Sequence, residues 1–155
     1  MKVFWIIVIV VLLFSCNANT DNSTQSKDSV IYTTSRISEI RETVNPNAVK
    51  TYNETIKSFE TTDYFKVSLF ETKQTFKYLI KISYKNLNEE DTLNVPNFGE
   101  VPEVEIKKGD KRPSCIVGFV DGSKQFRESK LIYFEDGILK IHVLKHYGVF
   151  AKEKT

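Results

Sequence analysis

Residues 76–85 restrict the fold most, because apolar and polar side chains alternate along them with little interruption. Aromatic and aliphatic residues, such as Tyr78, Ile80 and Ile82, occupy every second position, and lysines occupy three of the five positions between them. Successive side chains of a β-strand point to opposite faces, so the pattern predicts one buried face and one lysine-rich face in water. Residues 65–69 alternate in the same way, and the polar residues 71–74 predict a turn between two antiparallel strands.

The last third of the chain is rich in hairpin signals. Asp121-Gly122 and Asp136-Gly137 stand between apolar runs, and both residue types tolerate the positive φ of tight hairpin turns. The connections are too short for crossover helices, so we expect a mainly antiparallel sheet. Including the shorter runs elsewhere, further strands are expected at residues 30–32, 92–95, 103–107, 114–120, 130–134, 138–144 and 147–151.

Residues 46–59 predict an amphipathic helix. Asn45 can cap it, and Pro46 suits the first helical position. Apolar side chains then recur at spacings of three, four and three, at Val49, Tyr52, Ile56 and Phe59. We expect this stripe to pack on the core, while a weaker repeat in residues 37–44 favours a second, shorter helix. The expected fold class is α+β: one N-terminal amphipathic helix packed on a mainly antiparallel β-sheet or sandwich of about six to eight strands.

The N-terminus begins with Lys2 and an unbroken apolar run at residues 3–14. Twelve residues give roughly 18 Å of helix, which is shorter than the ~30 Å hydrocarbon core of a bilayer. The run therefore predicts the core of a signal peptide rather than a membrane-spanning helix. Residues 17–29 contain Ala18 as their only apolar residue, so we expect a flexible tether that extends to roughly 45 Å at most.

The end of the apolar run, Leu13-Phe14-Ser15-Cys16, resembles the lipobox of bacterial lipoproteins. This resemblance implies that Cys16 is acylated, palmitate included, and becomes the new N-terminus after cleavage. By analogy with Gram-negative lipoproteins, Asn17 after the cysteine implies an outer-membrane anchor facing the periplasm. The alternative is an ordinary secretory signal that happens to end near Cys16. The expected organisation is a signal peptide at 1–15, a lipidated N-terminus and tether at 16–29, and a single globular domain at 30–155.

Charge and cysteine content limit the partners. The chain has 22 Lys and Arg against 20 Asp and Glu, and this balance argues against binding to nucleic acid, which favours a basic excess. The expected partners are the lipid bilayer, through Cys16, and a protein of the cell envelope.

If Cys16 carries lipid, Cys115 has no disulfide partner, and its apolar surroundings in the sequence predict a buried, unreactive thiol.

The sequence contains no recognisable catalytic or metal motif. His142 and His146 would lie roughly 13 Å apart on one face of a strand, too far to share a zinc ion. Gly-x-Ser-x-Gly, phosphate-binding glycine loops, Cys-x-x-Cys and His-Glu-x-x-His are missing from the sequence, and no cofactor or metal is expected. The expected function is a non-catalytic binding module of the envelope. The alternatives are a carrier of a small apolar or lipid-like ligand and a hydrolase with a dispersed site.

Residues 93–113 form the expected contact with a protein partner. Pro96, Pro102 and Pro113 restrict this backbone, and a restricted loop loses less entropy on binding. Its bases all follow Ile106, and apart from Asp110 its acids all precede it. Complementary charges of this kind set orientation and association rate. The expected interaction surface consists of Glu103, Glu105, Lys107, Lys108, Lys111 and Arg112. A second possible surface is the lysine face of residues 77, 81 and 85.

Overall fold

A computed structural model describes residues 29–33, 37–101 and 103–151, and these contain strands, turns and loops but no helix. The expected signal peptide, Cys16 and residues 17–28 lie outside the described residues. In the part described, no helix is long and apolar enough to span a membrane. The predicted α+β class is therefore wrong: the described chain is all-β.

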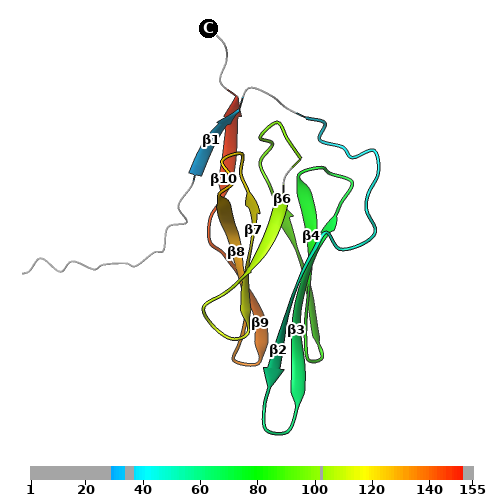
Figure 1. Cartoon of the computed structure of the whole chain (residues 1–155), viewed down its shortest axis with the longest axis vertical. Helices are drawn as coiled ribbons and strands as arrows, with labels where there is room; N and C mark the ends of the chain where they lie inside the picture. The colour runs from blue at the N-terminus through cyan, green and yellow to red at the C-terminus, as the bar shows by residue number, and fades with distance from the viewer. Residues whose placement is uncertain (1–28, 34–36, 102, 152–155) are drawn as a thin grey trace, which may run out of the picture.

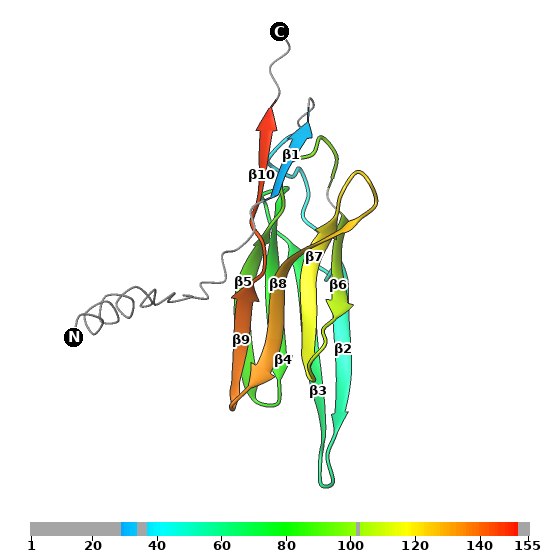
Figure 2. The same ribbon diagram turned by 90° about the vertical axis from the view of Figure 1, so that its left-hand side faces the viewer.

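Eight strands form two four-stranded antiparallel sheets, each with its strands in chain order (Figure 1). The first sheet contains β2 (Lys50–Lys57), β3 (Thr62–Glu71), β4 (Lys77–Tyr84) and β5 (Leu87–Asn94). The second contains β6 (Glu103–Lys108), β7 (Ser114–Val120), β8 (Phe126–Glu135) and β9 (Ile138–Val143). A parallel pair, β1 (Ser29–Thr33) and β10 (Tyr147–Ala151), lies at one end of the molecule (Figures 1 and 2).

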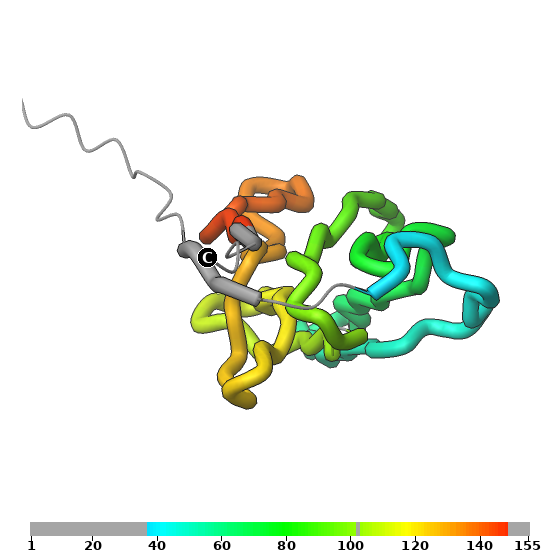
Figure 3. The backbone as a smooth tube through the Cα atoms, turned by 90° about the horizontal axis from the view of Figure 1, so that it is seen from above, coloured from blue at the N-terminus to red at the C-terminus, as the bar shows by residue number. Residues whose placement is uncertain are grey.

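The two sheets pack face to face around one apolar core. Phe65, Leu69 and Ile80 from the first sheet meet Phe119 and Ile132 from the second, and all five are fully buried. At the sides of this sandwich, β2 lies beside β6 and β5 lies beside β9. Figure 3 shows the two layers from above, with the cyan segment 37–49 running along the side of the first sheet.

Strand β2 occupies most of the predicted helix, and it pairs with β3 along its whole length. Every second side chain of β2 points inward, as in any strand. One of these inward residues is the charged Glu54, so the sequence does not show the apolar–polar alternation that would predict a strand. The predicted helical stripe combined Tyr52 and Ile56, which do point inward, with Phe59. The side chain of Phe59 is fully exposed, beyond the end of the strand. The shorter helix is also absent: Ile40 forms an isolated antiparallel bridge with Gln74.

The two Asp-Gly pairs have different structures. Asp136 and Gly137 have φ values of 54° and 83°, as a tight hairpin between β8 and β9 requires. At the other pair, the Asp121 carboxylate caps a longer loop by accepting hydrogen bonds from the backbone N–H groups of Ser123 and Gln125, both at 3.0 Å. The positive φ in that loop, 61°, falls on Lys124.

Candidate functional site

The six residues of the expected interaction surface lie along one edge of the second sheet. Four of them are on β6, which pairs only with β7, and Lys111 and Arg112 follow in the turn. Val104 and Ile106 of β6 are buried in the core, so Glu103, Glu105 and Lys107 face outward. The structure thus brings the expected acids and bases together on one strand, where they do not form separate patches.

Two ion pairs join this edge to β2 of the first sheet. Lys50 Nζ lies 2.9 Å from Glu105 Oε2, and Arg112 Nε lies 2.6 Å from Glu54 Oε1. Glu54 is only 6 % exposed, and the Tyr52 hydroxyl also donates to it at 3.2 Å. Burial first, and then the Glu54 charge, raise the pKa of Tyr52 to about 12.

Glu105 is held as a carboxylate by its neighbours. Partial burial acts to raise its pKa, but hydrogen bonds from Lys50 and from the Ile106 backbone N–H outweigh burial and lower it. These contacts fix the edge strand in place. Glu105 and Arg112 therefore hold the two sheets together as well as carrying charge at the surface.

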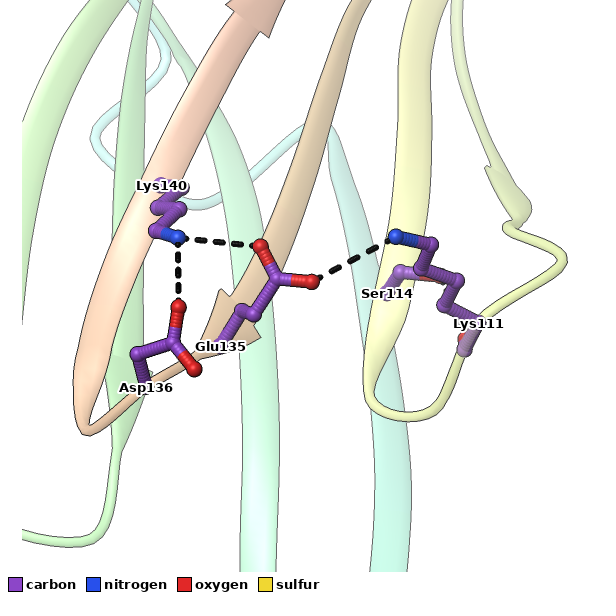
Figure 4. Close-up of polar contacts among 5 residues, drawn as sticks. All are labelled: Lys111, Ser114, Glu135, Asp136 and Lys140. Carbon is purple, nitrogen blue, oxygen red and sulfur yellow. Dashed lines mark hydrogen bonds and ion pairs between the residues drawn. The ribbon is translucent and has the colours of Figure 1, made fainter.

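Lys111 belongs to a second ionic network, which reaches the β8–β9 hairpin (Figure 4). Its Nζ lies 3.4 Å from Glu135, and Lys140 lies 2.9 Å from Glu135 and 3.1 Å from Asp136. The Lys140 hydrogen bond and the Lys111 charge lower the pKa of Glu135. The Ser114 hydroxyl donates to the Lys111 carbonyl and fixes the turn that carries this lysine.

Three of the six residues keep their charges free of such pairs. Glu103, Lys107 and Lys108 are exposed, and none forms an ion pair with another described residue. Lys107 Nζ lies 4.4 Å from the centre of the Phe126 ring, a cation–π contact on the outer face. This strand edge therefore presents one acid and two bases to a partner.

Two of the three lysines expected on the lysine face lie on the outer face of the first sheet, and the third lies in a turn. Lys77 and Lys81 lie on the outer face of the first sheet, and Lys81 is 3.2 Å from Glu90. Lys85 begins the β4–β5 turn with φ of 55°, which directs its Nζ over the rings of Tyr84 and Phe134. Lys66 of β3, which the sequence analysis passed over, shares a hollow of about 360 Å³ with Lys81. The alternation of residues 65–69 puts Lys66 at an outward position, and this pattern could have predicted that it lies on the same face as Lys81.

Cys115 is fully buried and free, as the sequence predicts. Burial, and secondarily the charge of Glu54, raise the pKa of its thiol to about 12, which leaves it protonated at neutral pH. His142 is exposed on β9, and His146 lies between β9 and β10. Among the residues that the structure describes, no group of three or more His, Cys, Asp and Glu side chains could hold a metal ion.

No family model, curated protein or solved structure matches this chain. The features of this chain that point to a function are the lipobox resemblance and the charged edge of β6.

Proposed function

We propose that this chain is a lipid-anchored binding module of a bacterial cell envelope. In this proposal Cys16 carries the lipid, the following residues form a tether, and the β-sandwich holds an envelope protein without catalysing a reaction. The sequence Leu13-Phe14-Ser15-Cys16 at the end of a short apolar run supports the anchor. Several acyl chains on one cysteine suffice for stable attachment, since each buried CH₂ contributes about 0.8 kcal/mol. By the analogy drawn from Asn17, the anchor is in the outer membrane and faces the periplasm.

The observation that carries the binding role is the charged edge of β6. Glu103, Lys107 and Lys108 are exposed and unpaired among the described residues, while their neighbours Glu105 and Arg112 are fixed to β2. An edge already held in place loses little conformational entropy on binding. Its unpaired charges favour a partner with an opposite arrangement, and they set the association rate and orientation.

Reversal of two lysines tests this role. We expect Lys107→Glu/Lys108→Glu in the full chain to reduce crosslinking to a partner protein in isolated envelopes. These two lysines are chosen because reversing Arg112 would leave Glu54 buried without its cation. Crosslinking of the unmodified chain should also fall with added salt, because exposed charges are screened within ~8 Å at physiological ionic strength.

Lys66→Glu is the control for position, since Lys66 is another exposed lysine, on the outer face of the first sheet. If only this control loses the partner, the interface lies on the lysine face and the β6 edge is not the contact. Equal crosslinking by the unmodified chain and both variants at low salt would contradict a charged interface at either place.

A further inference from the structure

The β2–β3 hairpin ends in a hydrogen-bonded turn that carries a fully exposed phenylalanine. The relative exposure of Phe59 is 105 %. The turn is locked because the Ser58 backbone N–H donates to the Thr61 carbonyl at 2.9 Å, and the Thr61 N–H donates to the Ser58 hydroxyl at 3.1 Å. Lys57 and Glu60 lie on either side of Phe59 in the sequence, and neither forms an ion pair with a described residue. We call residues 57–60 the Phe59 tip.

A hollow of about 340 Å³ lies at the other end of β3. Its apolar lining is Ile40, Phe76 and Val95, and Ile40 remains 55 % exposed. Glu39 and Lys77 also line it, and neither forms an ion pair within the part of the chain described. We call this depression the Ile40 hollow.

The backbone around the Ile40 hollow is fixed by hydrogen bonds between three segments. The Arg41 N–H donates to the Lys73 carbonyl, and the Thr75 N–H donates to the Glu39 carbonyl, both at 2.9 Å. The Val95 N–H donates to the Phe76 carbonyl at 2.8 Å. The hollow is therefore a preformed receptor, as the Phe59 tip is a preformed ligand, and neither has to be ordered on binding.

The tip and the hollow are complementary in size and charge. A cavity of about 150 Å³ accommodates benzene, so the Ile40 hollow has room for the ring of Phe59. The tip carries one base and one acid, Lys57 and Glu60, and the hollow carries the opposite pair, Glu39 and Lys77. Seating the ring would remove from water the most exposed large apolar side chain of the described residues, and it would let these charges pair.

The two parts cannot meet within one molecule. They lie at opposite ends of β3, a ten-residue strand that spans roughly 34 Å (Figure 1). We propose that this chain associates head to tail, with the Phe59 tip of one copy in the Ile40 hollow of the next. Such a heterologous contact gives an open chain with a free tip and a free hollow at its two ends, or a ring where the rotation closes. The contact is small and weak in solution, and confinement to a membrane would raise its effective concentration.

Paired cysteines test this geometry directly. The full chain with Glu60→Cys/Gln74→Cys keeps the Phe59 ring and the apolar lining of the Ile40 hollow. Purified in nonionic detergent and oxidised, it should give a ladder of dimers, trimers and higher forms. Each of the two substitutions alone should give no ladder. Because these chains keep Cys16 and Cys115, they also show whether either native cysteine contributes. Tyr64→Cys/Gln74→Cys is the matched control, because Tyr64 is exposed on the same hairpin but lies outside the tip. A ladder equally strong in this control, or its absence from the first variant, would overturn the proposal.

Unmodified side chains provide a second measurement. In sedimentation equilibrium of the full chain in detergent, Phe59→Ala should raise the dissociation constant at least about tenfold, because a seated aromatic ring supplies much of the energy of such a contact. Glu60→Lys should also weaken association, and Glu60→Lys/Lys77→Glu should restore it. An unchanged constant for Phe59→Ala, or no restoration by the double reversal, would contradict the contact.

Discussion

Arg112 donates a hydrogen bond from Nε to Glu54 Oε1 at 2.6 Å, and so joins the turn after β6 to β2 of the facing sheet. The two residues are separated by 58 positions in the chain. The carboxylate is 6 % exposed and the guanidinium side chain 65 %, so Arg112 covers an acid that would otherwise be buried without a cation.

Loss of Arg112 should destabilise the sandwich. We expect Arg112→Ala to lower the free energy of unfolding by about 1–3 kcal/mol, because Glu54 would remain buried and keep only the Tyr52 hydroxyl. Lys50→Ala is the control: its pair with Glu105 also joins β2 to the second sheet, but the Glu105 carboxylate is more exposed than Glu54, so its loss should cost less than about 1 kcal/mol. Urea unfolding measures both, and equal effects would show that Glu54 is not the reason.

Acid should remove the contribution of Asp121. Burial acts to raise its pKa, but hydrogen bonds from Ser123, Gln125 and Arg127 lower it from 3.8 to about 2. Because the folded-state pKa is depressed, this group stabilises the fold above about pH 4, and the contribution is lost as pH falls towards 2. The advantage of the unmodified protein over Asp121→Asn should shrink over this window, by about 2 kcal/mol at most. A constant difference between pH 5 and pH 2 in urea unfolding would be inconsistent with this assignment.

The thiol of Cys115 should be unreactive in the folded protein. With a pKa of about 12, roughly one molecule in ten thousand carries the thiolate at pH 8, and the side chain is also fully buried. In a Cys16→Ser chain, a thiol reagent should modify Cys115 at least about 100-fold faster in urea than in native buffer. Rapid modification without denaturant would mean that the β7 region opens readily.

The lipid anchor depends on Cys16. We expect Cys16→Ser to incorporate no labelled palmitate and to accumulate as an unprocessed precursor, because the acyl acceptor is lost. Ser15→Ala, which keeps a small residue before the cysteine, should retain labelling. Labelling that persists in Cys16→Ser would exclude the lipobox interpretation.

The antiparallel strands could be predicted from sequence because their periodicity is local. In β4 the inward Tyr78, Ile80 and Ile82 alternate with polar residues, so the strand is visible without knowledge of its partners. In β2 the same alternation is broken by Glu54, whose inward position is stabilised by Arg112 from the second sheet. That contact joins residues far apart in the chain, so local sequence patterns do not reveal it. The remaining apolar spacing therefore predicted a helix.

The candidate site was predictable only in part for the same reason. The charges of residues 103–112 were evident, but which of them are free depends on β2 and on the β8–β9 hairpin. Glu105 and Lys111 meet Lys50 and Glu135, partners that lie 55 and 24 positions away. Phe59 was assigned to a buried stripe because its exposure follows from a turn that the helix prediction excluded.

The parallel pairing of β1 with β10 has a mechanical consequence if the chain is anchored through Cys16. A pull transmitted from the membrane would reach Ser29 first, where β1 begins opposite Tyr147. The paired residues of β1 and β10 would then separate one pair after another, towards Thr33 and Ala151. Release of five residues would lengthen the tether by roughly 17 Å while both main sheets stay closed. Separation of this strand pair would thus take up force from the membrane before the sandwich itself is loaded.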